Sequence, residues 1–306
     1  MIVDLPDTTT NVINKRITSL REEGGAITLG RVLTLVVAPH CEEILEDAIN
    51  AAVSASREHP CRIIVVVPVE RDAADPRLDA QLRVGGDAGA GEVVVLKTAG
   101  PLGEHAASVV LPFLLPDTPV VTWWPGDAPA VPAQDPLGRL AIRRITDATG
   151  STDPLGTLRS RLAGYTLGDT DLAWSRITYW RALLASSLDQ PPYEPVTSAV
   201  VSGVASEPAL DILAGWLATC IDGPVRRETG TLKVELELPT QTIVLSRPQD
   251  GATATLTRTG RPEALLPLAR RETRECLAEE LRRLDADEIY HEALVGIDKA
   301  IYPDAT

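Results

Sequence analysis

RVLTLVVAPHCEEILEDAINAAVSASREHPCRIIVVVPV, residues 31–69, contains two apolar, β-branched runs on either side of a helical stretch. The runs at 31–38 and 61–69 are nearly continuous in Val, Ile and Leu, which is typical of strands buried on both faces. Between them, residues 42–58 repeat apolar side chains at helical spacing. A strand, a helix and a second strand in succession predict two parallel strands joined by a right-handed crossover.

The same alternation continues before and after this stretch. Two more buried strands are expected at 92–97 and 120–124, a further strand within AIRRITDAT (141–149), and helices at 11–22 and near 103–115. Residues 77–91, which end in GGDAGAG, are expected to form a loop or hairpin. The first half of the chain therefore predicts an α/β domain with a parallel sheet.

The second half has a different pattern. A strand at 197–205 and a helix at 208–222 precede TLKVELEL (231–238), where apolar and charged residues alternate as in a half-exposed strand. Two further strands at 241–246 and 252–258 continue an antiparallel meander. Two helices follow, with Leu277, Leu281 and Leu284 in one stripe. This half predicts an α+β domain with an antiparallel meander.

The domain boundary is expected near Gly168, where the α/β pattern ends. The sequence thus predicts domains at 1–168 and 169–306, both of ordinary size. The proline-rich stretch DQPPYEP (189–195) is a rival boundary.

Composition excludes several functional classes. The 306 residues include 29 basic and 43 acidic side chains, a formal charge of −14, which argues against nucleic acid or anionic membranes as partners. No apolar run is long enough to span a bilayer, and no export signal is visible, so a cytoplasmic location is expected. The four cysteines form no C-x-x-C pair, which argues against zinc ribbons.

No motif in the sequence indicates a cofactor or a catalytic centre. GGDAGAG precedes a strand and has the wrong spacing for a dinucleotide fingerprint, and the Walker A, G-x-S-x-G and H-E-x-x-H patterns are absent. PHCEE (39–43) gathers possible metal ligands, but adjacent His40 and Cys41 point apart, and the two acids suit the first turn of a helix. We expect no catalytic residues, no metal site and no cofactor.

TAGPLGEH (98–105) is a candidate anion site because it follows a strand and opens a helix with two glycines. Free amides at such a helix start can hold a phosphate or a carboxylate. Gly100, Gly103 and His105 are the candidate residues. The alternative is an ordinary turn between a strand and a helix.

DLAWSRITYWRALLAS (171–186) holds two of the five tryptophans. A helical wheel places Trp180 in the apolar stripe, as a core residue, with Trp174 and Arg181 together on one edge and Arg176 on the other. The opposite face is small and uncharged, and consists of Ser175, Thr178, Ala182, Ala185 and Ser186. We therefore expect two surfaces to close on this helix, the second being the other domain or another protein.

VVTWWPGDAP (120–129) places Trp123 and Trp124 side by side at a strand end. Adjacent strand residues point to opposite faces, so we expect at least one indole at the sheet edge or in a crevice. The pair either plugs the sheet end or provides an anchor for a partner, since tryptophan is enriched in binding hot spots.

VDLPDTTT, TLGRVLTLVV, TWWPGDAP and DLAWSRITYWRALLAS, taken together, resemble the glucose-6-phosphate dehydrogenase assembly protein family of actinobacteria, OpcA. The resemblance extends over essentially the whole chain. It implies a non-catalytic assembly factor or activator that binds glucose-6-phosphate dehydrogenase and promotes the oxidative pentose phosphate pathway.

Under this interpretation the partner-binding candidates are Trp123, Trp124, Trp174, Arg176 and Arg181. The alternative is an α/β enzyme or sensor that binds a sugar phosphate or nucleotide at the 98–105 turn.

Overall fold

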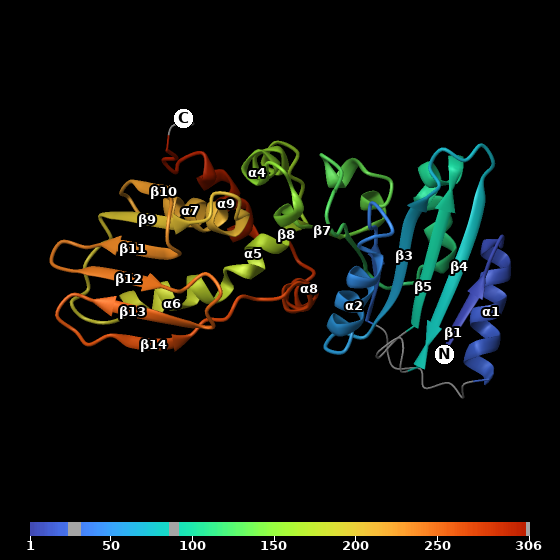
Figure 1. The fold of residues 1–306 in the computed structure, drawn as a ribbon, viewed down its shortest axis with the longest axis horizontal. Helices are drawn as coiled ribbons and strands as arrows, with labels where there is room; N and C mark the ends of the chain where they lie inside the picture. The colour runs from blue at the N-terminus through green and yellow to red at the C-terminus, as the bar shows by residue number, and fades with distance from the viewer. Residues whose placement is uncertain (24–31, 86–91, 304–306) are drawn as a thin grey trace. The chain divides into compact units, whose positions relative to one another are not determined.

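The computed structural model describes residues 1–23, 32–85 and 92–303 (Figure 1). Contacts between Cα atoms divide the chain into two compact units, and each is described by itself. The first unit is Met1–Asp147, Thr166–Thr170 and Thr273–Ala286; the second unit is Ala148–Tyr165, Asp171–Glu272 and Asp287–Thr306. The two units are defined by contacts between Cα atoms, whereas the boundary expected near Gly168 separates domains that would fold independently. That boundary stays a prediction.

The first unit is built on an eight-stranded sheet in the order β1-β4-β5-β3-β2-β6-β7-β8. Its strands are β1 (Ile2–Leu5), β2 (Leu33–Val37), β3 (Cys61–Val69), β4 (Arg77–Val84), β5 (Glu92–Ala99), β6 (Val120–Trp123), β7 (Arg143–Thr146) and β8 (Asp169–Asp171). The pairs β5–β3, β3–β2, β2–β6 and β6–β7 are all parallel. The expected α/β fold with a largely parallel sheet is confirmed.

Of the two alternatives expected at 77–91, a loop or a hairpin, the hairpin is confirmed, and strand β4 is its first arm. It pairs antiparallel with β5 along its whole length, and β1, which was not expected, pairs antiparallel with β4. Leu78, Ala80 and Leu82 are buried and alternate with polar residues, so the period of a half-exposed strand was present. Most of GGDAGAG lies outside the described residues.

Helices cover both faces of this sheet. These are α1 (Thr10–Glu23), α2 (Leu45–Ala55), α3 (Ala106–Val110) and α8 (Thr273–Arg282). Ile13 of α1 and Val109 of α3 share a core with Ile64 and Leu96 of the sheet, whereas α2 packs against β2, β3 and α8.

The single helix expected near 103–115 is three short pieces. Around α3 lie two 3₁₀ turns, η2 (Gly100–His105) and η3 (Leu111–Phe113). Pro101 and Pro112 lie near the start of these turns. Because proline has no N–H and clashes with the preceding turn, a continuous α-helix through these positions is disfavoured.

The second unit has a six-stranded sheet in the order β10-β9-β11-β12-β13-β14. Its strands are β9 (Ser198–Gly203), β10 (Val225–Thr229), β11 (Lys233–Glu237), β12 (Thr242–Ser246), β13 (Thr253–Arg258) and β14 (Ala264–Pro267). Only β9 and β10 pair in parallel; the other pairs are antiparallel. This confirms the antiparallel meander, to which β10 and β14 are additions.

The helices of the second unit are α4 (Pro154–Ala163), α5 (Leu172–Arg176), α6 (Thr178–Leu188), α7 (Pro208–Cys220) and α9 (Glu288–Ile297). Helices α7 and α9 pack closely because Gly215 and Gly296 lie where they touch. A Cβ on Gly215 would lie 2.2 Å from the carbonyl oxygen of Ala293. None of the helices in the described part of the chain is long and apolar enough to cross a membrane.

Candidate functional site

The segment from Asp171 to Leu188 is two helices, not the single helix expected from its sequence. The Asp171 carboxylate accepts a hydrogen bond from the Ala173 amide at 2.9 Å and caps α5. At Ile177 the backbone leaves helical geometry, with φ −98° and ψ 4°, before α6 begins. Side chains after the break are therefore rotated relative to the positions given by a continuous helical wheel.

The two tryptophans of this segment are both buried. Trp180 is 5% exposed and belongs to the core with Leu184 and Leu213, as predicted. Trp174, which the wheel placed on the edge of the apolar stripe, is 2% exposed and therefore buried as well, and its part in partner binding stays a prediction. Its indole N–H donates to the carboxylate of Asp287 at 2.8 Å.

Arg181 lies against Trp174, and the wheel predicted this neighbourhood correctly. Its guanidinium carbon is 3.4 Å from the centre of the Trp174 ring system, a cation–π contact. Arg181 also donates to the Thr178 hydroxyl at 3.2 Å, and Arg176 donates to the Thr149 hydroxyl at 3.0 Å. Both arginines are half-buried, and their part in partner binding stays a prediction.

The outer face of α6 is exposed and uncharged. We call it the α6 surface and define it by Tyr179, Ala182, Ala185 and Ser186, which are all exposed. The Tyr179 side chain is 52% exposed, and the guanidinium of Arg271 lies 4.9 Å from its ring centre. A surface helix ordinarily places charged residues on its outer face. The α6 surface therefore has the composition of a contact surface.

A cavity of about 400 Å³ adjoins the α6 surface. Ala185 belongs to both, and most of the other lining residues are apolar, among them Leu184, Leu188, Trp216 and Ile221. This cavity was missed from the sequence. Its walls come from α6, α7, β11 and the segments 194–196 and 221–222, which include the acids Glu194 and Asp222, and no spacing along the chain indicates that these elements enclose a space.

Trp123 and Trp124 are buried on opposite faces of the first unit's sheet. Their exposures are 1% and 4%, which agrees with the alternative that the pair plugs the end of the sheet. Trp124 packs in the core with Val120 and Leu137. The Trp123 indole N–H has no hydrogen-bond acceptor among the described residues. Their assignment to partner binding stays a prediction.

The turn at 98–105 holds its backbone by internal bonds. The amide of Gly100 donates to the carbonyl oxygen of Glu70 at 3.1 Å, so it is already engaged. Gly100 has φ +56°, and a Cβ there would lie 2.5 Å from the Ala73 carbonyl oxygen. Gly103 is half-buried and His105 is exposed. Anion binding by Gly100, Gly103 and His105 stays a prediction.

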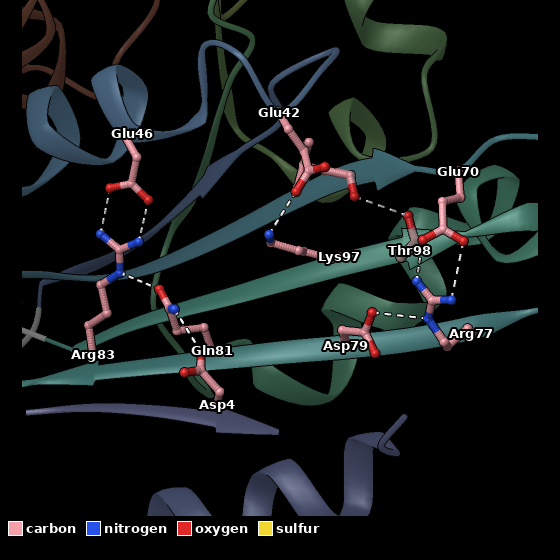
Figure 2. A network of polar contacts seen from close by, with 11 residues as sticks. Asp4, Glu42, Glu46, Glu70, Arg77, Asp79, Gln81, Arg83, Lys97 and Thr98 are labelled. Atoms are coloured by element: carbon pink, nitrogen blue, oxygen red, sulfur yellow. Dashed lines mark hydrogen bonds and ion pairs between the residues drawn. The ribbon is translucent and has the colours of Figure 1, made fainter. Parts of the chain in front are cut away.

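Ion pairs occupy the polar face of the sheet beside this turn, as Figure 2 shows. Arg77 contacts Glu70 at 2.7 Å and Asp79 at 3.0 Å. The hydrogen bonds from Arg77 lower the pKa of the Glu70 carboxyl. Arg83 similarly binds Glu46 at 2.5 Å.

The remaining groups in Figure 2 extend the same pattern. Lys97 contacts Glu42 at 2.7 Å, and the Gln81 amide donates to Asp4 at 2.7 Å. Arg77, Arg83 and Lys97 each contact a carboxylate. The positive charges of this face are therefore already paired within the protein.

The PHCEE segment is engaged with its own neighbours. The ring Nδ1 of His40 accepts the Asp127 amide at 3.3 Å, and the carbonyl oxygen of His40 accepts from Arg71 at 2.8 Å. A hydrogen bond with the Glu43 carboxylate raises the pKa of the Cys41 thiol. Within residues 1–23, 32–85 and 92–303, no group of three or more His, Cys, Asp or Glu side chains is placed to hold a metal ion.

Two family models match successive parts of the chain. Residues 52–163 match the model described as the glucose-6-phosphate dehydrogenase subunit N-terminal domain, and residues 167–294 match the C-terminal domain of that subunit. Together they cover most of the chain. No curated protein sequence matches it.

Several solved structures are similar to the chain at low identity. A probable oxidoreductase, yhhX, has 6% identity and a TM-score of 0.46, over 87% of this chain and 95% of that one. A putative oxidoreductase, yvaA, from Bacillus subtilis has 9% identity and a TM-score of 0.46, over 87% and 94%. The myo-inositol dehydrogenase of Lactobacillus casei has 10% identity and a TM-score of 0.34, over 88% and 93%. At these values the likenesses carry no inference about activity.

Proposed function

Because the chain belongs to the OpcA family of glucose-6-phosphate dehydrogenase assembly subunits, we propose that it acts without catalysis, by binding the dehydrogenase through its second unit. Its role lies in assembly of that enzyme in the pentose phosphate pathway. We propose two things: the protein catalyses no reaction itself, and a surface of its second unit contacts the dehydrogenase.

The observation that carries the proposal is the pairing of the α6 surface with the neighbouring apolar cavity. Ala182, Ala185 and Ser186 leave a flat, uncharged strip on an exposed helix. The cavity beside it, with Trp216 in its wall, is large enough to take an apolar side chain from another protein. Protein interfaces are depleted of charge at their centre, and their strongest contacts are apolar anchors seated in pockets.

A charge placed on the α6 surface tests the proposed contact. We expect Ala182→Arg to weaken binding to the dehydrogenase by about 2 kcal/mol or more, the cost of a hot-spot substitution. The side chain is exposed, so the melting temperature of the free protein should hardly change. Binding is measured by titration calorimetry, and activation by the dehydrogenase turnover and apparent KM.

Ser160→Arg is the matched control, because it adds the same charge at an exposed helical position of the same unit, on α4. It should leave binding unchanged. Equal binding by the Ala182→Arg variant and the native protein would place the contact elsewhere. If the native protein neither co-elutes with the dehydrogenase nor changes its kinetics, the proposed function itself fails.

A further inference from the structure

Four arginines converge on one small cavity of the second unit. The cavity is about 50 Å³, and its polar lining consists of Arg176, Arg247, Arg270, Arg271, Gln249 and Glu207. Glu207 is the one acid among its described lining residues. Such an excess of positive charge contrasts with a formal charge of −14 for the whole chain.

Arg247 differs from every other buried arginine among the described residues. Five arginines are buried there, and Arg247 is 8% exposed. The other four each contact a carboxylate: Arg62 with Glu92, Arg143 with Glu280, Arg144 with Asp169 and Arg227 with Asp211. Within the described part of the chain, Arg247 forms no ion pair within 4.0 Å. Buried charges are ordinarily paired, because leaving water is costly for an ion.

The hydrogen bonds of Arg247 are also incomplete. One terminal nitrogen donates to the Leu268 carbonyl oxygen at 2.8 Å. The Nε–H is buried and has no acceptor among the described residues. Burial lowers the pKa of the guanidinium, and the nearby Arg270 lowers it further, against the opposing effect of Glu207. An arginine nevertheless stays protonated in proteins, so the cavity holds a charge that lacks a close counterion.

The other arginines are held in place around it. Arg271 donates to the Ser175 carbonyl oxygen at 2.6 Å, and Arg176 donates to the Thr149 hydroxyl at 3.0 Å. Arg270, whose side chain is 54% exposed, contacts Glu207 at 3.1 Å. The Oε2 atom of Glu207 thus contacts the exposed arginine, whereas its buried Oε1 has no hydrogen-bond partner among the described residues, and the carboxylate forms no ion pair with Arg247.

We propose that this cavity binds a phosphate group, with Arg247 as its buried ligand and Arg270 at its exposed side. Four guanidinium groups and one carboxylate give the lining a formal charge of about +3, which suits a doubly charged anion. The planar fork of arginine can bind two phosphate oxygens at once. The cavity has room for one such group, and the remainder of a phosphorylated metabolite would extend into solvent.

Titration of the full chain with inorganic phosphate at constant ionic strength tests the inference. We expect saturable binding, which Arg247→Met should weaken about 10- to 100-fold through the loss of charged hydrogen bonds. Arg270→Met, at an exposed position, should weaken it less. Glu207→Gln should tighten it, because it removes the one opposing charge. Arg226→Met, on the exposed side of β10, is the matched control and should have no effect.

Two probes identify the source of the phosphate. Tighter binding of glucose 6-phosphate than of inorganic phosphate would assign the site to a sugar phosphate, and equal binding would assign it to the phosphate group alone. Either result supports the inference if the Arg247→Met variant binds the probe more weakly than the native protein does. If that variant does not fold, the Arg270→Met and Glu207→Gln variants decide.

The inference is overturned if phosphate does not bind to the native protein, or binds equally to all variants. It is also overturned if phosphate does not bind while the Arg247→Met variant loses the dehydrogenase, since the cavity would then receive a carboxylate of that partner. The inference does not depend on the proposed function, because phosphate binding is measured without the dehydrogenase.

Discussion

Trp174 is fixed by contacts with three other side chains of the second unit. Its N–H reaches Asp287, Arg181 covers its ring, and its ring centre lies 6.1 Å from that of Tyr290. Asp287 at the same time caps α9 by accepting the Tyr290 amide at 3.0 Å. The indole thus joins α5 to the start of α9.

Substitutions at Trp174 should therefore affect stability as strongly as substitutions at Trp180. We expect Trp174→Ala and Trp180→Ala each to cost about 3–5 kcal/mol, since both remove a large buried side chain. Trp174→Phe keeps an aromatic ring but loses the N–H donor and part of the indole volume, so it should cost about 1–3 kcal/mol, less than Trp174→Ala. Denaturant titration of the three variants measures these differences.

Arg181→Ala is the control, because it removes the cover of the Trp174 ring but leaves the indole in place. It should cost less than either tryptophan substitution. A Trp174→Ala variant as stable as the native protein would show that the indole is not part of the core.

At the level of single residues, the sequence predicted one neighbour of Trp174, Arg181, and did not predict that Trp174 is buried. The helical wheel placed Arg181 beside it, because both lie on one short segment. Asp287, which helps to bury it, lies 113 residues further along the chain. A wheel describes one helix and contains no information on what packs against it.

At the level of the elements, the cavity lined by α6 and α7 contains a cysteine that can be labelled chemically. Cys220 is exposed at the end of α7 and lines the cavity beside the α6 surface. Partial burial raises the pKa of its thiol, so its reaction with a maleimide should be slower than that of a free cysteine at neutral pH.

Bound dehydrogenase should slow the labelling of Cys220 further if it covers this cavity. Cys41, in the first unit and partly exposed, is the internal control and should react at the same rate with and without the partner. Peptide mass spectrometry of the labelled protein follows both sites. Unchanged labelling of Cys220 in the saturated complex would exclude the cavity from the interface.

The strands and helices were largely predictable where their periodicity is strong. Strand β3 begins and ends where its apolar run does, and the β11–β13 meander follows its alternation. The break at Ile177 was not predictable, because no proline or glycine lies there. Two further strands, β10 and β14, are short and lie at the two edges of their sheet. A short edge strand can form without a strong alternation of apolar and polar residues, so these two were missed.

In the whole chain, the first unit depends on a segment that comes late in the sequence. Helix α8 packs on α2, and its Glu280 contacts Arg143 of β7 at 2.5 Å, with both side chains buried. Arg143 also donates to the carbonyl oxygen of Asp285 at 2.7 Å. No local pattern in the sequence indicates that residues 273–286 return to this unit.

Removal of Glu280 should therefore destabilise the first unit. We expect Glu280→Ala to cost about 3–5 kcal/mol, because it leaves the charge of Arg143 buried without its partner. Hydrogen exchange should rise in α2 and α8 peptides of the first unit. Glu279→Ala, at the half-buried neighbouring position, should have a much smaller effect. Similar exchange in both variants would show that the buried ion pair contributes little.

The late position of α8 also determines when the protein can fold during its synthesis. The eight-stranded sheet is complete in sequence once β8 has been made, yet α2 still lacks α8, which is made about one hundred residues later. While the ribosome translates the meander of the second unit, α2 can pack on β2 and β3, but the side of α2 that contacts α8 has no cover. The nascent chain therefore exposes this surface for the time needed to make those residues. In that interval we expect the chain to be most prone to aggregation and most dependent on a chaperone.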